Sequence, residues 1–229
     1  MIFPIGDDQV KGGHTPWFSY SFIGLNVIFF LYKFSLNTEQ QEGFDLYFGA
    51  IPAEITNGQD LFTLVTSMFV HADFWHLLGN MLFLWVFADN IEATAGNLKF
   101  LLFYLIGGFV AVFAHIWFNM DSEMPMIGAS GAISAVMGAY LVMFPTSRIK
   151  LLFLIFPFRI TTWIFLGIWI IQQCTYGTSS LASGMGDGVA WWAHIGGFAM
   201  GLLVGFLFRV TGHLETDELE TVELETDQA

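Results

Sequence analysis

The chain has 229 residues, of which 55% are apolar and 12% charged, and its net charge is −13. Soluble domains carry about 25% charged residues, so this composition excludes an ordinary soluble globule and predicts a single-domain polytopic membrane protein. The negative charge excludes a nucleic-acid binder, and the lone cysteine, Cys174, excludes a disulfide scaffold.

Six apolar stretches follow an N-terminal segment, residues 1–16, that we expect to be cytoplasmic from the distribution of basic residues described below. This segment has no apolar core, so no cleavable signal peptide is expected. A spanning helix needs about 20 mostly apolar residues, with a lower limit of about 17. Residues 17–211 contain six stretches of about this length, which predicts an all-α membrane domain of six helices. In chain order these are Trp17–Tyr32, Phe74–Ala88, Phe100–Phe118, Ser130–Phe144, Ile160–Gln172 and Val189–Phe208.

Three further segments do not fit the spanning pattern. Residues 37–75 form the longest connection and are mostly apolar, which suits partial immersion in one leaflet. The apolar run Leu151–Phe158 contains Pro157 and is followed by Arg159, so we interpret it as an interfacial or re-entrant piece. Residues 212–229 repeat Leu-Glu-Thr and are rich in acids, and like-charge repulsion predicts a disordered tail there.

The basic residues predict the orientation of the spans. Six spans place both termini on one side of the membrane, and cytoplasmic termini leave Lys33 as the one base outside, as the positive-inside rule favours. The bases then expected in the cytoplasm are Lys11, Lys99, Arg148, Lys150, Arg159 and Arg209. Because no organelle transit sequence is recognised, we expect a prokaryotic plasma membrane.

Polar side chains inside three of the expected spans are the candidate functional residues, because such groups are costly in lipid. His76 and Asn80 are four residues apart and therefore share a helix face. Ser130 stands in a Gly-Ala-Ser-Gly sequence at the start of the fourth span, and His194 lies near the start of the sixth. All three spans begin at the expected outer face, which predicts that these side chains lie at a similar depth.

Small residues predict that the fourth and sixth spans pack closely. Gly197, Gly201 and Gly205 recur every four residues on the face of His194, and the fourth span carries a matching stripe from Gly131 to Gly138. Such a crossing would bring the hydroxyl of the serine in the fourth span beside the imidazole of the sixth. A serine activated by an adjacent base is the requirement for nucleophilic acyl transfer.

The neighbouring groups suit an oxyanion hole. The backbone N–H of Ser130 at a helix start and the side chains of His76 and Asn80 are expected donors, and each donor is worth about 3–4 kcal/mol of barrier. No intramembrane carboxylate is placed to orient His194, so a Ser-His dyad is predicted rather than a triad.

Simpler interpretations of these residues remain open at this point. The Gly-Ala-Ser-Gly sequence also suits helix packing, and His194 alone also suits a hydrogen-bonded packing residue. His76 with Asn80 would be half of a metal site, but no further ligand completes it, so neither a metal nor another cofactor is expected. We expect His115 to be structural and Glu92 to cap a helix or pair locally.

Taken together, the motifs resemble the rhomboid family of intramembrane serine proteases from about Pro16 to Gly205. The resemblance depends on the order and spacing of four short sequences on the second, fourth and sixth spans. These are His71-x4-His76-x3-Asn80, Asp89-Asn90-Ile91-Glu92, Gly128-Ala129-Ser130-Gly131 with Gly138-Ala139-Tyr140 and Pro145, and Ala193-His194-Ile195-Gly196-Gly197.

The resemblance implies that Ser130 is the nucleophile and His194 the general base, with His76, Asn80 and the Ser130 N–H forming the oxyanion site. It implies a cavity that opens outward and is capped by the Gly- and Ser-rich loop of residues 178–187. Substrates would be single-span membrane proteins, cut within the lipid bilayer near the outer end of their helix. The sequence carries no signal for a particular oligomeric state.

The chain departs from the family pattern at two places. Ser134 stands where some members have a Tyr that stacks on the base, so we expect Trp191 or Trp192 to orient His194 instead. Phe62-Thr63 stands where a Trp-Arg pair often anchors the first outer loop. A catalytically inactive relative that binds or escorts membrane clients is the alternative function, although such a relative is expected to lose the serine or the histidine. A small transporter fits less well, because no inverted repeat is apparent.

Overall fold

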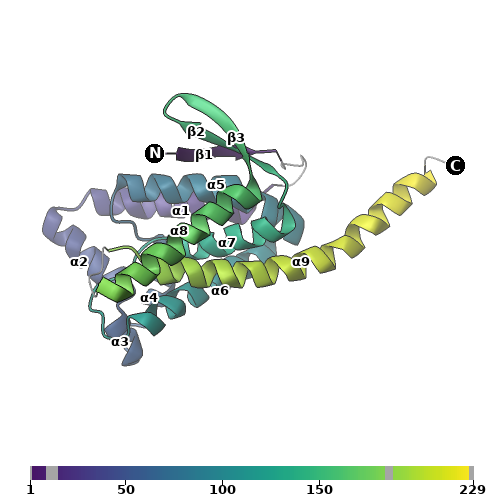
Figure 1. Cartoon of the computed structure of the whole chain (residues 1–229). Coiled ribbons are helices and arrows are strands. Elements are labelled where there is room, and N and C mark those ends of the chain that lie inside the picture. The colour runs from purple at the N-terminus through teal and green to yellow at the C-terminus, as the bar shows by residue number, and fades with distance from the viewer. Residues whose placement is uncertain (1, 9–14, 184–187, 227–229) are drawn as a thin grey trace.

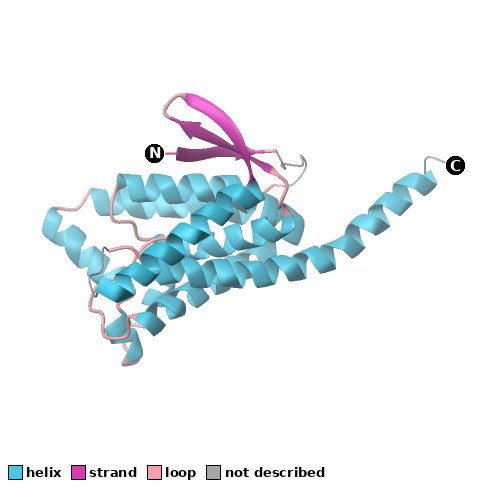
Figure 2. Cartoon of the chain, in the orientation of Figure 1, coloured by secondary structure: helices cyan, strands magenta, loops and turns pink. Residues whose placement is uncertain are grey.

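The computed structural model describes the backbone of residues 2–8, 15–183 and 188–226, and the side chains of these residues except 183 and 211–226. Within that part of the chain, six helices of 14 residues or more form a bundle, as Figures 1 and 2 show. They are α1 (Trp17–Phe34), α5 (Phe74–Ala95), α6 (Asn97–Phe118), α7 (Ser130–Met143), α8 (Thr162–Ser183) and α9 (Trp191–Thr226). Each corresponds to one expected span, so the predicted helical membrane bundle is confirmed.

Three helices extend more than one turn beyond the spans that the sequence predicts. Helix α5 continues past Ala88 to Ala95 and ends at Gly96, whose φ of +84° suits glycine. Helix α8 continues to Ser183, so the first part of the expected lid is helical, and residues 184–187 lie outside the described residues. Helix α9 continues through Thr226 and extends beyond the bundle in Figure 1. Disorder of the tail therefore stays a prediction, since its side chains are not described.

The long connection between α1 and α5 folds into four short helices rather than one irregular loop. They are α2 (Thr38–Phe48), α3 (Pro52–Thr56), α4 (Thr63–Thr66) and the 3-10 helix η1 (Ser67–Phe69). Asn37 starts α2 through a capping box, in which its side chain accepts a hydrogen bond from the Gln40 N–H at 2.9 Å. The Pro at the first position of α3 suits a helix start, because its missing N–H is not needed there.

A small antiparallel sheet covers part of the bundle and was not expected. Its order is β1 (Ile2–Asp7), β2 (Arg148–Phe153) and β3 (Phe156–Thr161), and β1 contacts α5. The run Leu151–Phe158 thus forms two strands of a hairpin and no seventh span, and its interfacial position stays a prediction. Ile149 and Leu151 are buried while their neighbours are more exposed, and this period of two is that of a strand. The partner strand β1 lies far away in the sequence, so local sequence patterns do not predict the pairing.

Helices α7 and α9 pack at backbone contact through their small residues, as the glycine spacing predicts. An added Cβ at Gly201 would overlap the carbonyl oxygen of Ala135, and one at Gly205 would lie 2.6 Å from the Cα of Ala139. In the other direction, an added Cβ at Gly138 would overlap the carbonyl of Phe198. The absence of side chains at these positions lets the two helices cross closely and places their N-terminal ends side by side.

Large apolar side chains remain exposed on the outside of the bundle. On α6 they form one stripe at helical spacing, made by Leu102, Ile106, Val110 and Phe113, while the opposite face is buried. A continuous apolar stripe of this kind suits contact with lipid tails. Among the described residues, α1, α6 and residues 191–210 of α9 are long and apolar enough to cross a membrane. The chain is a multi-pass membrane protein.

A buried carboxylate joins the C-terminal end of α5 to the start of α1. Glu92 is fully buried and accepts hydrogen bonds from the N–H groups of Phe18 and Ser19, at 2.9 and 2.8 Å, and from the Ser19 hydroxyl at 2.6 Å. The expectation of a cap is confirmed, but the capped helix is a distant one rather than a local partner. A carboxylate at a helix N-terminus satisfies unpaired donors and complements the helix dipole.

Candidate active site

Ser130 is the first residue of α7, and its position depends on the turn that precedes it. Gly128 has a φ of +122°, and its N–H donates to the carbonyl of Ser67 at 2.9 Å. An added Cβ at Gly128 would lie 2.8 Å from Nε2 of His76, so a side chain there would push that imidazole away. Ala129 makes no side-chain capping bond to α7. The N-cap residue therefore leaves the first-turn N–H groups of α7 without a side-chain cap.

The structure brings Ser130 and His194 together. Nε2 of His194 lies 2.7 Å from the Ser130 hydroxyl oxygen, although the two residues are 64 positions apart in the chain. The close crossing of α7 and α9 makes this contact, because both side chains project from the first turns of their helices. Ser134, one turn further along α7, donates its hydroxyl proton to the Ser130 carbonyl at 2.6 Å.

The second ring nitrogen of His194 has a partner that the sequence did not predict. Nδ1 lies 2.8 Å from Oε1 of Gln173, a residue of α8 that is 4% exposed. Trp191 lies edge-on to the imidazole with ring centres 6.2 Å apart, whereas Trp192 stacks on Phe118 at 3.7 Å. Of the two expected aromatic partners, one is therefore near His194, and the direct hydrogen bond comes from Gln173.

A signal for Gln173 was present in the sequence. The expected fifth span ends at Gln172, which leaves the adjacent Gln173 just outside it. In the structure, α8 continues for more than two turns beyond it and buries Gln173 within the bundle. A polar side chain one helical turn from Trp169, on the face that meets His194, would have been a candidate by the same argument that selected His76 and Asn80.

His76 and Asn80 lie on α5 beside the serine and the base. Asp73 caps α5 by accepting hydrogen bonds from the N–H groups of Trp75 and His76, at 2.7 and 2.9 Å. Asn80 is 7% exposed, and its Nδ2 donates to the His76 carbonyl at 2.8 Å. Its Oδ1 is buried and has no hydrogen-bond partner among the described residues.

All four candidate residues line one cavity of about 630 Å³, which lies at the N-terminal ends of α5, α7 and α9. Aromatic and apolar side chains supply most of the remaining wall, including Phe83, Met126, Trp169 and Trp191. His115 also lines this cavity, and its interpretation as a structural residue stays a prediction. In the described part of the chain, no group of three or more His, Cys, Asp or Glu side chains is arranged to hold a metal ion.

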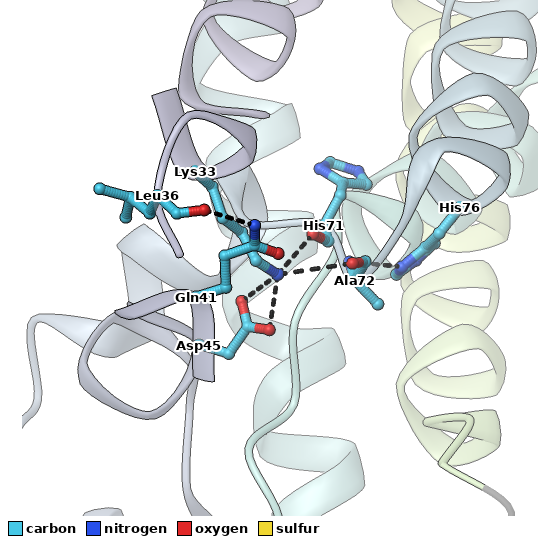
Figure 3. Close-up of polar contacts among 7 residues, drawn as sticks. All are labelled: Lys33, Leu36, Gln41, Asp45, His71, Ala72 and His76. Carbon is cyan, nitrogen blue, oxygen red and sulfur yellow. Dashed lines mark hydrogen bonds and ion pairs between the residues drawn. The ribbon is translucent and has the colours of Figure 1, made fainter. Parts of the chain in front are cut away.

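A buried ion pair anchors the segment that precedes α5, and Figure 3 shows its contacts. Nζ of Lys33 lies 2.5 Å from the carboxylate of Asp45 and donates to the carbonyl of His71 at 3.0 Å. The N–H of the next residue, Ala72, donates to Nδ1 of His76 at 3.4 Å. These bonds connect α1, α2 and the start of α5, and they supply the loop anchoring that Phe62-Thr63 left open.

The titratable groups of this anchor have shifted pKa values. Burial raises the pKa of Asp45, against the opposing effect of Lys33. Burial and the nearby His76 lower the pKa of His71 from 6.5 to about 3, so the His71 imidazole is neutral over the physiological range. A neutral His71 leaves Lys33 and Asp45 as the charged pair of the anchor.

Comparison with known proteins relates this arrangement to one family. A family model described as Rhomboid domain matches residues 58–211, which contain all four candidate residues. "Rhomboid protein 1, mitochondrial" of Saccharomyces cerevisiae is 31% identical over 153 residues, which cover 63% of this chain and 41% of that protein. "Rhomboid protease GluP" of Bacillus subtilis is 34% identical over 137 residues, or 58% of this chain and 26% of that protein.

A plant protein gives a similar result. "RHOMBOID-like protein 4" of Arabidopsis thaliana is 29% identical over 160 residues, which cover 70% of this chain and 37% of that protein. The chain thus spans less than half the length of these three relatives. The similarity concerns the helical bundle that holds the candidate residues.

Proposed function

The chain belongs to the rhomboid family, and on that premise we propose that it is an intramembrane serine endopeptidase with Ser130 as nucleophile and His194 as general base. The observation that carries the proposal is the 2.7 Å contact between the Ser130 hydroxyl and Nε2 of His194, on the wall of a cavity inside a membrane bundle. A hydroxyl in hydrogen-bond contact with an imidazole is the arrangement that activates a serine for acyl transfer.

In the first step, Nε2 of His194 accepts the hydroxyl proton while the Ser130 oxygen attacks the carbonyl carbon of the scissile peptide bond. The resulting oxyanion is held by the backbone N–H of Ser130 at the start of α7 and by the side-chain N–H groups of His76 and Asn80. The carbon–nitrogen bond then breaks, and the His194 imidazolium gives its proton to the leaving amine. The products of this step are the free amine fragment and an acyl-enzyme.

Water completes the reaction. His194 takes a proton from a water molecule in the cavity, and the hydroxide attacks the acyl carbon to form a second tetrahedral intermediate. Its collapse breaks the bond to the Ser130 oxygen, which takes back the proton from His194 and releases the carboxylic acid fragment. The polar part of the cavity wall suits this step, because it provides water with hydrogen-bond partners within the bundle.

Single-span membrane proteins are the proposed substrates. The apolar side chains that line the cavity beside the polar ones suit residues of a transmembrane segment. A substrate helix must unwind locally, because an intact helix keeps its carbonyl groups in backbone hydrogen bonds. We place the protein in a plasma membrane with both termini in the cytoplasm, so that cleavage occurs near the outer end of the substrate helix. The distribution of basic residues between the loops supports this orientation.

The test uses the purified full chain in vesicles with a model single-span substrate. Ser130→Ala is expected to abolish cleavage while expression and thermal stability stay intact. A serine-directed fluorophosphonate should label the wild type but neither Ser130→Ala nor His194→Ala. Undiminished cleavage by Ser130→Ala would contradict the serine mechanism. A wild-type chain that neither cleaves nor labels would support the alternative, an inactive relative that binds or escorts membrane clients.

A further inference from the structure

Gln173 completes a chain of three side chains from three different helices. The Ser130 hydroxyl from α7 meets Nε2 of His194 from α9 at 2.7 Å, and Nδ1 of the same ring meets Oε1 of Gln173 from α8 at 2.8 Å. Among the described residues, these two are the hydrogen-bond partners of the His194 ring. Because Gln173 is 4% exposed, bulk water does not compete for its amide in this position.

We propose that Gln173 is the positioning residue of the catalytic base and fixes its tautomer, so that the site is a Ser-His-Gln relay rather than an unsupported dyad. The inference rests on the proposed function. An amide oxygen only accepts hydrogen bonds, so Nδ1 of His194 carries the proton of the neutral ring. Nε2 then keeps its lone pair free for the Ser130 proton. The same bond holds the ring plane in line with the hydroxyl.

The surroundings of His194 explain why an amide occupies this position. In the described part of the chain, the titratable side chains that line the cavity with it are Asp73 and His76 at the start of α5 and His115 on α6, and Trp169 and Trp191 flank its ring. A buried carboxylate at Gln173 would carry a charge that none of these groups balances while the imidazole is neutral. An amide supplies the acceptor without that cost, and its dipole still stabilises the imidazolium that forms during the reaction.

The experiment compares three variants by the kinetics of substrate cleavage over a range of pH. Gln173→Met keeps the volume of the side chain but removes the acceptor, and kcat is expected to fall on the order of a hundredfold with KM and thermal stability unchanged. Gln172→Met is the matched control. Gln172 is the neighbouring residue on α8, and its side chain is exposed and makes none of these contacts. It should retain the wild-type kcat and pH profile.

Gln173→Glu restores an acceptor and tests the tautomer directly. Its carboxylate would stabilise the protonated imidazole, so activity should recover relative to Gln173→Met. The acid limb of the kcat/KM profile should also move upward by about one pH unit relative to the wild type. An unchanged limb would mean that the side chain at position 173 does not contact the base, and the Glu variant gives this result even if the Met variant fails to fold.

Two outcomes would overturn the relay. One is a wild-type kcat in Gln173→Met, and the other is a Glu variant with an unshifted acid limb. Either result leaves the proposed function standing as long as Ser130→Ala is inactive and unlabelled. Conversely, persistent cleavage by Ser130→Ala would overturn the protease mechanism whatever the Gln173 variants do. The two failures are therefore distinguishable.

Discussion

The two ends of α5 bury polar side chains that differ in how completely they are hydrogen-bonded. At the C-terminal end, both oxygens of Glu92 accept hydrogen bonds from α1, and Nδ2 of Asn90 donates to Asp7 at 2.9 Å. At the N-terminal end, Asn80 has a buried oxygen without a partner among the described residues, and it lines the cavity with His76. Saturated polar groups hold the bundle together, whereas groups with unused hydrogen-bonding capacity beside a cavity are available to a substrate.

The largest effect is expected when the hydrogen-bonded carboxylate of Glu92 is removed. Glu92→Ala leaves two N–H groups and a hydroxyl at the start of α1 buried without their acceptor, and each unpaired donor costs about 1–3 kcal/mol. We expect a loss of about 3–5 kcal/mol in the free energy of unfolding, measured by thermal denaturation in detergent.

The cleavage activity of Glu92→Ala tests whether the two ends of α5 have separate roles. Cleavage per folded molecule of Glu92→Ala at low temperature should match the wild type, because Glu92 lies far from the cavity. Glu92→Gln serves as the matched control and should lose less stability, since its amide oxygen still accepts hydrogen bonds. A lower kcat of Glu92→Ala under conditions where the variant is fully folded would show that the two ends of α5 are coupled.

The corresponding substitution at the N-terminal end of α5 removes a polar group that is not fully hydrogen-bonded. Asn80→Ala removes one proposed oxyanion donor, and kcat should fall about a hundredfold, or about 2.7 kcal/mol, without complete loss because other donors remain. Its thermal stability should equal or exceed that of the wild type, since the variant no longer buries an unpaired oxygen. Steady-state cleavage and thermal denaturation, measured on the same preparation, check both statements. A large loss of stability with unchanged kcat would make Asn80 a structural residue like Glu92.

The smallest effect concerns the pH dependence of the anchor before α5. The folded-state pKa of His71 is lowered to about 3 from 6.5, so the unfolded chain binds a proton that the folded chain does not. Stability from this group is therefore complete above about pH 6.5 and is lost as the pH falls toward about 3, by about 1.4 kcal/mol for each pH unit.

Replacing the imidazole by a group that does not titrate isolates this contribution. His71→Gln should show a smaller decrease in melting temperature between about pH 7 and about pH 5 than the wild type. The other titratable groups are common to both proteins, so the difference between the two curves reports His71 together with its interaction with the nearby His76. Parallel curves would mean that His71 is protonated as easily in the folded chain as in the unfolded one.

Much of the fold and of the site was predictable because its signals are local. A run of apolar residues predicts a span from composition alone, and the four-residue spacing of Gly197, Gly201 and Gly205 predicts a close crossing without any partner sequence. Ser130 and His194 could be paired from the sequence because helix direction and depth follow from the order of the spans. These inferences need the position of a residue on its own helix and nothing else.

The remaining contacts join segments whose sequences carry no sign of each other. Gln173 and His194 are 21 residues apart, and Glu92 caps a helix that begins more than 70 residues earlier. Strands β1 and β2 pair with each other although helices α1 to α7 lie between them in the sequence. Such partners are selected by how whole helices pack, because a buried polar atom bonds to whichever complementary group the packing brings within about 3 Å.

The sequence by itself determined that this is a bundle of membrane helices and that a serine, a histidine and two further polar residues lie near one depth. Only the tertiary structure decided which polar groups are saturated and which remain available, since saturation depends on distances between helices. The tertiary structure shows that the helix capped by Glu92 is α1 and that the hydrogen-bond partner of His194 is Gln173. The physical reason is that apolar periodicity is a property of one helix, whereas a hydrogen bond between helices is a property of their packing.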